Sequence, residues 1–495
     1  MRVLLINPHD AAQNGFSSAP LGLAYLAGTL QSHGLEVAII DGFLAGLKGI
    51  QDKVREYEPD IAGITSYTPG FHSALEIASW IKRYRARTLV VLGGPHATIM
   101  WKQILATWPE VDLCVLGEGE QTLLELAQGR PFTDISGIAF RDDSKPTRSP
   151  YRQQVENLDS IPFPAWNLLP LGQYPASGLG TFNGVNIAKE PRIPVVFSRG
   201  CTGSCVFCST WWIWRGHRCR SARNMADEIE LLSKRYGVKS VWFADDAFSV
   251  NMDSVKELCR EIVARDLRIA WFATTRVDAI DRELLLAMKE AGCYAISYGV
   301  ETGSQPLLDL MGKTASVKAA TDAIVATRKA GLRAVALMIT GNKGETDETI
   351  NQTVDFLKEA KPTSIGSVGG LWLLPGTALY QEVKRRGLID DSYWLTDRPT
   401  PVYLAEHDAE ELRRYTFALA YRTKVHTRWF WLLWSLYRMA KALQHGARTV
   451  SARILETTRV AGPVHPGSGR YHASQLRSVW QRASDTTGDK PTGTA

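Results

Sequence analysis

Three cysteines within one short stretch are the strongest chemical signal in the sequence. Cys201, Cys205 and Cys208 follow the spacing C-x3-C-x2-C in the run SRGCTGSCVFC. Thiolates crowded in this way hold either a zinc ion, which takes four ligands, or an iron–sulfur cluster. For zinc, Cys219 or His217 is available as the fourth ligand. A [4Fe–4S] cluster with one iron left open for a substrate needs only three thiolates, and the spacing favours it.

Charged residues end several predicted strands further along the chain. Glu301 and Gly299 occur in YGVETGS, and a carboxylate at that strand end suits an amino group. Arg276 in TTRVD and the pair Asp245–Asp246 in FADDAF end two earlier strands. Taken singly, such charges are ordinary solvated or paired strand ends. In a barrel of parallel strands, however, these ends meet on the rim where the chemistry takes place.

The elements that would position these residues alternate regularly from residue 191 to about 385. Six apolar strands are predicted at PVVFSRG, SVWFADD, RIAWFAT, YAISYGVE, RAVALMITG and IGSVGGLWLL, separated by helical patterns. Strands that alternate with helices indicate a parallel sheet. Six such units predict a partial (β/α)6 barrel of TIM type, with the three cysteines directly after its first strand.

Residues 1 to about 140 show the same alternation in a separate unit, so the fold class is α/β throughout. Five apolar strands, from RVLLINP to DLCVLGEGE, predict a doubly wound parallel sheet. Ligands bind such sheets at the carboxyl ends of the strands, but no G-x-G-x-x-G opens the first helix to indicate a dinucleotide. The strand ends are mainly small and would let a ligand approach the backbone. They are Pro8, Thr65, Ser66, Gly93, Gly94, Gly117 and Gly119.

The remaining segments connect or follow these two units. Residues 141–190 are rich in proline and glycine and are expected to form a linker that packs on both neighbours. Residues 386–460 are predicted to be a helical region. Within it, segment 428–441 has tryptophans and basic flanks, which fit either a membrane-surface helix or a buried helix. Residues 461–495 have the composition of a disordered tail.

Composition narrows the class of protein. A chain of 495 residues is too long for one core, and a net charge of +6 is too mild to demand nucleic acid, so none is predicted. The longest apolar run, WFWLLWSLY, is far shorter than the roughly 20 residues that a spanning helix needs. The N-terminus carries no signal cleavage site, and seven cysteines with three clustered argue against a disulfide framework. We therefore expect this protein to be located in the reducing cytoplasm.

The cysteine loop, with Phe207 before its last cysteine, and the barrel pattern together resemble the radical S-adenosylmethionine enzymes. The resemblance implies that the three thiolates hold three irons of a [4Fe–4S] cluster, and that the open iron takes the amino and carboxylate groups of S-adenosylmethionine. Glu301 matches the carboxylate that binds the amino group, and Gly299, Arg276 and Asp245 are expected around the same cofactor. Residues 1–140 resemble the cobalamin-binding domain of one large branch, through PLGLAYLAGTL, GITSYT, VLGGPHAT and VLGEGEQTLLEL.

Two departures from related motifs have consequences. The D-x-H-x-x-G motif is absent, which implies cobalt without a histidine lower ligand; His9 and His96 are the histidines to suspect otherwise. In the turn GNKGET, Lys343 stands where a proline is common, which weakens the inference that this turn serves the ribose of S-adenosylmethionine.

The resemblance also implies a reaction. Cleavage of S-adenosylmethionine yields a 5′-deoxyadenosyl radical, and methylcobalamin gives its methyl group to the resulting carbon radical. The run CSTWWIWRGHRCRS resembles that of hopanoid C-3 methylases and anaerobic magnesium-protoporphyrin cyclases, which act on large, flat, apolar molecules. Simple packing between domains is the alternative for Trp211, Trp212 and Trp214.

The sequence thus predicts a cobalamin-dependent methylase of a hydrophobic polycyclic substrate, of hopanoid type. A porphyrin-type oxidative cyclase and a zinc-stabilised binding protein without turnover are the alternatives. We expect an electron donor such as flavodoxin or ferredoxin as a partner, and a peripheral contact with the inner face of the cell membrane.

Overall fold

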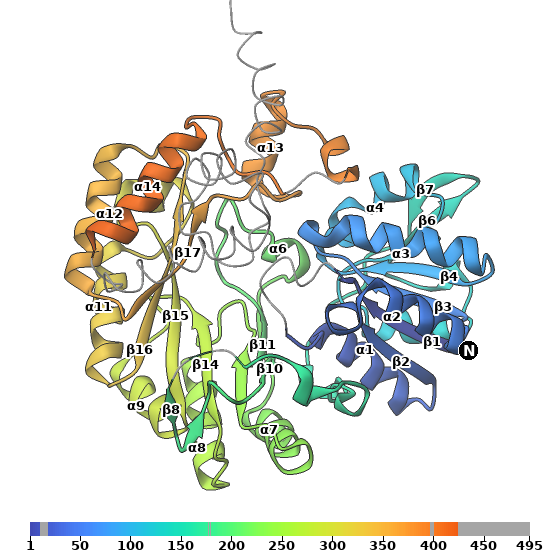
Figure 1. Ribbon diagram of the computed structural model, residues 1–495, viewed down its shortest axis with the longest axis horizontal. Helices are drawn as coiled ribbons and strands as arrows, with labels where there is room; N and C mark the ends of the chain where they lie inside the picture. Colours follow the sequence, from blue (N-terminus) through green and yellow to red (C-terminus); the bar gives the residue numbers. More distant parts are fainter. Residues whose placement is uncertain (10–17, 177, 179, 397–399, 424–495) are drawn as a thin grey trace, which may run out of the picture.

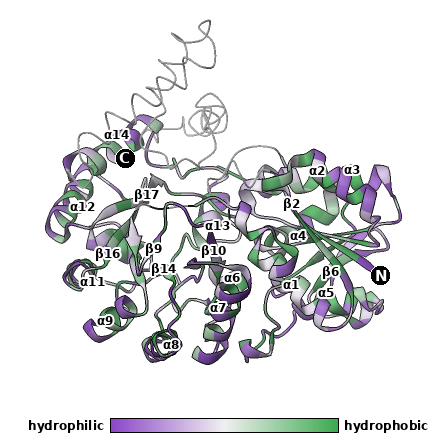
Figure 2. Cartoon of the chain, turned by 60° about the horizontal axis from the view of Figure 1, so that its bottom comes forward, coloured by the Kyte–Doolittle hydropathy of each residue, from purple (hydrophilic) through white to green (hydrophobic). Residues whose placement is uncertain are grey.

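Two parallel sheets, each flanked by helices, lie side by side in the computed structural model (Figure 1). The structure describes residues 1–9, 18–176, 178, 180–396 and 400–423. Strand interiors of both sheets are apolar, whereas the outward faces of the helices are largely hydrophilic (Figure 2). The α/β architecture predicted from the alternation of strands and helices is therefore confirmed.

The N-terminal sheet has seven strands in the order β2-β1-β3-β4-β5-β6-β7. Its helices pack on both faces, so the sheet has a separate apolar core on each side. Because the chain leaves β1 toward β2 on one side and toward β3 on the other, the switch point for a ligand lies between β1 and β3. The bounds are β1 Arg2–Asn7, α1 Leu21–Ser32, β2 Glu36–Asp41, α2 Gly42–Tyr57, β3 Ile61–Thr65, α3 Phe71–Tyr84, β4 Leu89–Gly93, α4 Pro95–Thr107, β5 Leu113–Val115 and α5 Glu120–Ala127.

Two short strands extend this sheet beyond the predicted parallel set. β6 (Ile138–Asp142) and β7 (Lys145–Arg148) form an antiparallel hairpin on the β5 edge. The predicted domain boundary at residue 140 therefore falls inside β6, and the sheet ends at Arg148. These strands are half polar, so the sequence has no continuous apolar run there that would have predicted them.

The barrel sheet has six parallel strands in chain order, β10-β13-β14-β15-β16-β17, which confirms the predicted partial barrel. Helices between the strands pack against its apolar core. The bounds are β10 Arg192–Val195, α7 Ala222–Tyr236, β13 Ser240–Phe243, α8 Met252–Ala264, β14 Ala270–Thr275, α9 Arg282–Glu290, β15 Cys293–Glu301, α10 Gln305–Leu310, α11 Val317–Lys329, β16 Arg333–Thr340, α12 Asp347–Ala360 and β17 Ser364–Gly370.

A small antiparallel pair brackets the cysteine loop. β11 (Ser198–Gly200) pairs with β12 (His217–Cys219), and the short helix α6 (Thr210–Ile213) lies between them in the chain. Figure 1 shows α6 and β11 at the centre of the molecule, between the two domains. The run PVVFSRG, predicted as one strand, is thus divided into β10 and β11.

The linker packs on both domains, as its composition suggested. Tyr174 donates its hydroxyl to Asp41 Oδ2 of the N-terminal domain at 2.8 Å. Trp166, which is buried, donates its indole N–H to Glu228 Oε1 of the barrel at 3.2 Å. The segment contains one small hairpin, β8 (Thr181–Phe182) with β9 (Val185–Asn186).

The chain after β17 joins the two domains and then returns to the barrel. Tyr393, Trp394 and Tyr403 are buried in the same core as α3 and α4, whereas α14 (Ala409–Arg422) packs on the barrel, donating from Arg414 to Asp347 of α12. The helix α13 spans Ala378–Arg385. The predicted surface helix 428–441 and the tail 461–495 lie outside the described residues. In the described part of the chain, every helix is too short or too polar to cross a bilayer.

Candidate functional site

The cysteine loop, residues 201–208, is held by barrel elements on both sides. The backbone N–H of Val206 donates to Met311 O at the end of α10, at 2.9 Å. Its carbonyl accepts from Leu379 N in α13, also at 2.9 Å. Within the loop, Gly203 N donates to Cys201 Sγ at 3.3 Å. The loop therefore has a defined position at the carboxyl ends of the barrel strands.

The thiols of the loop lie close enough to affect one another electrostatically. A Cβ placed on Gly203 would lie 3.5 Å from Cys201 Sγ and 3.9 Å from Cys205 Sγ, so both sulfurs turn toward the same glycine. Burial raises the pKa of Cys205, and the thiols of Cys208 and Cys201 raise it further. All three cysteines are half-buried and outside any disulfide. Such an open trio can be reached by a cofactor.

The surroundings of Cys219 and His217 bear on the zinc alternative. In the part of the chain that is described, no three histidine, cysteine or carboxylate side chains converge on one ion position, as tetrahedral zinc requires. A cluster instead places each thiolate on a different iron. Cys219 Sγ lies 3.7 Å from His217 Nδ1, and His217 Nε2 is 3.2 Å from Ala247 O. The zinc alternative, which needed Cys219 or His217 as a fourth ligand, is therefore not supported.

Two cationic side chains approach the loop from the barrel. Arg276 bonds Asp278 Oδ2 at 2.6 Å and Thr314 Oγ1 at 2.8 Å. Its Nη1 lies 2.9 Å from the Cβ position of Gly203. Lys313, which sequence reasoning missed, is 92% buried and opposes the rise in the pKa of Cys205 that burial causes. A cluster with thiolate ligands is anionic, so nearby cations stabilise it.

Glu301 is aimed at the same place by a strained backbone. Its φ is +69°, in the region that residues with a Cβ rarely adopt, and the register of β15 against β16 shifts between Gly299 and Glu301. Its Oε1 accepts from Lys313 Nζ at 2.8 Å, and Lys313 also donates to the carbonyl of Gly299. A Cβ on Gly299 would lie 2.7 Å from Glu301 Oε1, so the glycine makes room for the carboxylate. Strain of this kind persists where function needs it.

Asp245 is held by hydrogen bonds inside the protein. Its carboxylate accepts from Phe197 N at 3.2 Å, and from Ser198 N and Ser198 Oγ at 2.5 Å each. The side chain is buried, and this burial raises its pKa to about 7. Asp245 thus supports the start of β11, and its contact with a cofactor stays a prediction. Its neighbour Asp246 accepts from Thr210 Oγ1 at 3.1 Å, beside the cysteine loop.

Of the residues predicted to bind cobalamin, some are buried and support the sheet edge, and others have open space beside them. Ser66 is fully buried: its hydroxyl donates to Gly93 O at 2.9 Å and accepts from Ala97 N at 3.2 Å. The side chain of Ser66 therefore supports the edge from within, and its contact with cobalamin stays a prediction. Gly94 has φ +93°, and a Cβ there would lie 2.8 Å from Ser66 O. Around Gly93, in contrast, a Cβ would meet open space.

The neighbouring turn after β5 shows the same division. Gly117 has φ +78° with open space around its Cβ position, and its N–H donates to Thr98 Oγ1 at 3.1 Å. A Cβ on Gly119 would lie 3.1 Å from Leu26 Cδ2, so this glycine faces the interior. The open backbone for a flat ligand therefore consists of Gly93 and Gly117, with half-buried Thr65 beside them. Tyr67, directly after Ser66, is 58% exposed and was missed because SYT carries no charge or metal ligand.

Neither suspected histidine is free at this edge. His96 is fully buried, with its ring centroid 4.2 Å from that of Phe71 and its Nδ1 3.1 Å from Thr68 Oγ1. Burial lowers its pKa to about 3, so it is neutral. His9 lies 3.8 Å from Glu76 Oε2. Both placements are consistent with the expectation that no histidine ligates cobalt.

A cavity of about 390 Å³ opens beside the cysteine loop. Trp211, Trp212 and Trp214 line it together with Cys201 and Gly203. The rings of Trp211 and Trp212 are stacked, with centroids 4.5 Å apart, and the indole N–H of Trp212 donates to Gly376 O at 2.5 Å. Trp211 is 40% exposed and Trp212 is 46% exposed. The cavity therefore combines three tryptophan rings with Cys201, a predicted ligand of the cluster.

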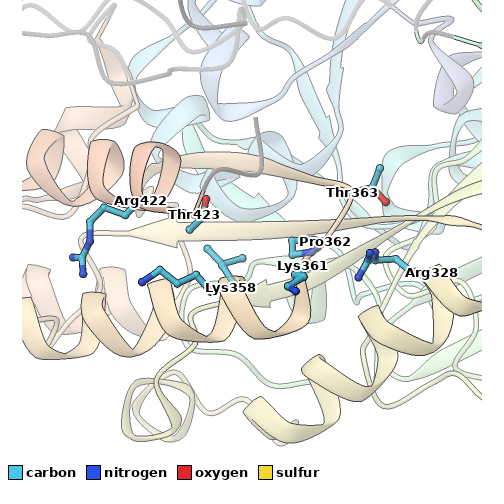
Figure 3. Close-up of a pocket in the computed structure, with 8 residues that line it drawn as sticks. Arg328, Lys358, Lys361, Pro362, Thr363, Arg422 and Thr423 are labelled. Carbon is cyan, nitrogen blue, oxygen red and sulfur yellow. The ribbon is translucent and has the colours of Figure 1, made fainter. Parts of the chain in front are cut away.

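A second cavity, of about 680 Å³, has a different character (Figure 3). Its cations lie at or near the C-terminal ends of α11, α12 and α14, at the opposite end of the barrel strands from the cysteine loop. Cations there complement the negative ends of the helix dipoles, which accounts for the positive charge without a ligand. They are Arg328, Lys358, Lys361 and Arg422.

Comparisons with known proteins agree with this geometry. The model of the radical SAM superfamily matches residues 195–357, and that of the B12 binding domain matches residues 11–127. An uncharacterized methyltransferase of Pyrococcus horikoshii is 34% identical over 373 residues, covering 72% of this chain and 78% of that protein. The anaerobic magnesium-protoporphyrin IX monomethyl ester cyclase of Rubrivivax gelatinosus is 33% identical, covering 73% and 66%.

More distant matches extend the picture. The hopanoid C-3 methylase of Methylococcus capsulatus is 24% identical, covering 63% of this chain and 59% of that protein. Among solved structures, the radical S-adenosylmethionine methyltransferase TsrM from Kitasatospora setae, with cobalamin and a [4Fe–4S] cluster bound, has a TM-score of 0.64 at 22% identity, covering 82% and 84%. The likeness to TsrM concerns the fold.

The chain belongs to the cobalamin-dependent radical S-adenosylmethionine enzymes. It is a methyltransferase of this type, and its cofactors are a [4Fe–4S] cluster, S-adenosylmethionine and cobalamin. When bound, these groups supply the radical and the methyl carrier, while the protein holds and orients them and excludes water. This membership also excludes the zinc-stabilised binding protein as an alternative.

Proposed function

We propose that the enzyme methylates an unactivated carbon of a large, apolar, polycyclic substrate, of hopanoid type. The observation that carries this proposal is the aromatic cavity of Trp211, Trp212 and Trp214, which shares Cys201 with the predicted cluster site. Stacked indole faces bind flat apolar surfaces, and the cavity is bordered by one charged side chain, Arg215. No side chain needs to act as a nucleophile when a radical and a methyl carrier provide the reactivity.

The test uses anaerobically reconstituted enzyme, a reductant and S-adenosylmethionine with an isotopically labelled methyl group. Hopanoid-containing vesicles are expected to acquire the label in the triterpenoid fraction. Replacing the exposed ring in Trp211→Ala should reduce labelling by about tenfold, since an aromatic contact contributes about 0.5–1.5 kcal/mol beyond its burial. Trp80→Ala is the control, because Trp80 is half-buried, stacks on Tyr84 of α3 and does not line the cavity. Unlabelled hopanoid would refute the substrate.

A second candidate is an oxidative cyclisation of the magnesium-protoporphyrin type. The relatives of that name are 33%, 32% and 26% identical, against 24% for the hopanoid methylase. The same labelling experiment separates the two: a cyclase would convert a porphyrin ester without incorporating the labelled methyl group. A methylated product favours the first candidate.

We further propose a peripheral contact with the inner face of an anionic membrane and reduction by a flavodoxin or ferredoxin. Segment 428–441 has tryptophans, leucines and flanking arginines and lysine, and each basic residue near such a surface contributes about 1 kcal/mol. A chain ending at Thr423 should lose vesicle binding and turnover of lipid substrate but keep cleavage of S-adenosylmethionine. Full vesicle binding by this shortened chain would contradict the membrane contact.

A further inference from the structure

Two carboxylates of the N-terminal domain bind an arginine that lies two residues before the first cysteine of the loop. Arg199 Nη1 donates to Glu118 Oε1 at 2.7 Å, and its Nη2 donates to Glu120 Oε1 at 2.6 Å. The side chains of Arg199 and Glu118 are 8% and 4% exposed. The guanidinium also lies 5.4 Å from the ring centroids of both Tyr25 and Trp214. These contacts cross from one domain to the other at the cysteine loop.

Glu118 is held from a third side as well. Arg218, the cross-strand partner of Arg199, donates to Glu118 Oε1 at 3.2 Å, and Val155 N donates to Glu118 Oε2 at 2.7 Å. Burial raises the pKa of Glu118, but Arg199, Val155 and Arg218 more than offset it, so the pKa lies below its usual value. Glu118 is therefore ionised, and it pairs with both cross-strand arginines of the β11–β12 pair.

The turn that supplies these carboxylates also carries part of the predicted cobalamin edge. Gly117, with open space at its Cβ position, directly precedes Glu118. Arg199 is separated from Cys201 by one residue, Gly200, where a Cβ would lie 2.1 Å from Gly216 O. The connection between the two predicted cofactor sites is therefore short and buried, and the close packing at Gly200 leaves little room for movement. A guanidinium holds two carboxylates in a fixed planar geometry, whereas the donors of an ammonium group rotate.

We propose that Arg199, clamped by Glu118 and Glu120, is a positioning residue that sets the cysteine loop at a defined place relative to the cobalamin-binding domain. The clamp would couple the two cofactors: with it, the methyl group of S-adenosylmethionine reaches cobalt; without it, both cofactors bind but are misplaced. The inference rests on the cofactor pair of the family and is independent of the organic substrate.

The test compares Arg199→Lys, Glu120→Gln and wild type as reconstituted holoenzymes. Hydrogen–deuterium exchange should accelerate by about tenfold or more in segments 113–127 and 198–208 of Arg199→Lys, because a buried carboxylate loses its partner, and should stay unchanged elsewhere. Iron, sulfide and cobalamin contents should match wild type. Transfer of the methyl group to reduced cobalamin, followed by absorbance, should fall at least tenfold, while formation of 5′-deoxyadenosine persists.

Glu120→Gln removes one arm of the clamp and should show the same pattern at smaller amplitude, so it carries the test if Arg199→Lys does not fold. Arg265→Lys is the control: its partners Asp227, Glu230 and Glu261 all lie on barrel helices, and it should change neither readout. Unchanged exchange in the two segments would overturn the proposal. So would a proportional loss of methyl transfer and 5′-deoxyadenosine, since that pattern means damage to the cluster site itself. Neither readout requires a hopanoid, so a wrong substrate leaves this test intact.

Discussion

The two sheets present their cofactors with different kinds of surface. At the N-terminal sheet the open edge is largely backbone, at Gly93 and Gly117, supported by the buried Ser66. At the barrel edge the surface consists of side chains, with thiols, cations and the strained Glu301. A corrin ring needs a flat surface that comes close, whereas a cluster needs ligand atoms. At the edge of the N-terminal sheet, the size of a substituted side chain should therefore determine how much cofactor binding is lost. At the barrel edge, the chemical type of the ligand atom should determine it.

The largest effect should come from the thiols. Replacing Cys201, Cys205 or Cys208 with alanine should abolish cleavage of S-adenosylmethionine, because each thiolate holds one iron. The measurement is 5′-deoxyadenosine formation together with iron and sulfide content. Cys219→Ala is the matched control, since its sulfur faces His217. If it lost as much metal as Cys205→Ala, atom type would not be what distinguishes the loop.

A comparison of adjacent glycines tests the backbone edge. Gly94→Ala should impair folding of the β3–β4 edge, because φ +93° and a contact of 2.8 Å to Ser66 O exclude a Cβ; such strain costs about 1–3 kcal/mol. Gly93→Ala should fold normally, since its Cβ meets open space, and should weaken cobalamin binding alone. Thermal unfolding and equilibrium dialysis of cobalamin separate the two effects. Normal cobalamin affinity in Gly93→Ala would show that the corrin does not approach this backbone.

The cobalamin of the wild-type protein should show no histidine nitrogen on cobalt. His96 is enclosed and neutral, and His9 lies beside Glu76. Electron spin resonance of the Co(II) form should therefore lack superhyperfine splitting from a protein nitrogen. Splitting that disappears in His96→Ala would mean that the backbone edge also uses a side chain, which would blur the contrast between the sheets.

At the barrel edge, charge should matter more than shape. Glu301→Gln keeps the size of the side chain but removes the charge that pairs with Lys313 and is expected to meet the amino group of S-adenosylmethionine. Hydrogen bonds to charged groups contribute about 1.5–3 kcal/mol, so binding should weaken by about 10- to 100-fold. Asp309→Asn on α10, whose carboxylate accepts only from the exposed Gln305 among the described contacts, should bind normally. Equal affinities would remove Glu301 from the site.

The last effect concerns the buried support of β11, and it is an effect on stability, not on cofactor binding or turnover. Burial raises the pKa of Asp245 to about 7 in the folded state, from 3.8. The folded protein therefore holds a proton there that the unfolded chain releases, so this group's contribution to stability falls as pH rises from about 4 to 7, by about 1.4 kcal/mol per unit. Thermal midpoints of wild type and Asp245→Asn between pH 5 and 8 measure it. The variant should lack that part of the slope, and identical slopes would show that the carboxylate is already ionised.

Much of this organisation is readable from local patterns. The spacing of Cys201, Cys205 and Cys208 determines that three thiolates lie within one loop, because eight residues cannot separate them widely. Apolar strands alternating with helices determine two parallel sheets, because only such layers bury both faces of a strand. Glycines at the strand ends mark where backbone can be approached. The half-polar hairpin β6–β7 escaped this reasoning because strands at a sheet edge need little apolar character.

Only the tertiary structure determines which partner and which degree of burial each charged side chain has. Asp245 and Asp246 are identical and adjacent in the chain, yet one is buried under β11 and the other lies beside the cysteine loop. Glu118 and Glu120 stand in a glycine-rich turn, and their partner Arg199 is some 80 residues away. Lys313 reaches Glu301 across a turn that no spacing rule anticipates. Pairing of this kind depends on how the strands and domains pack in three dimensions. Burial determines both the free energy needed to desolvate a charge and the strength of its electrostatic attraction to a partner.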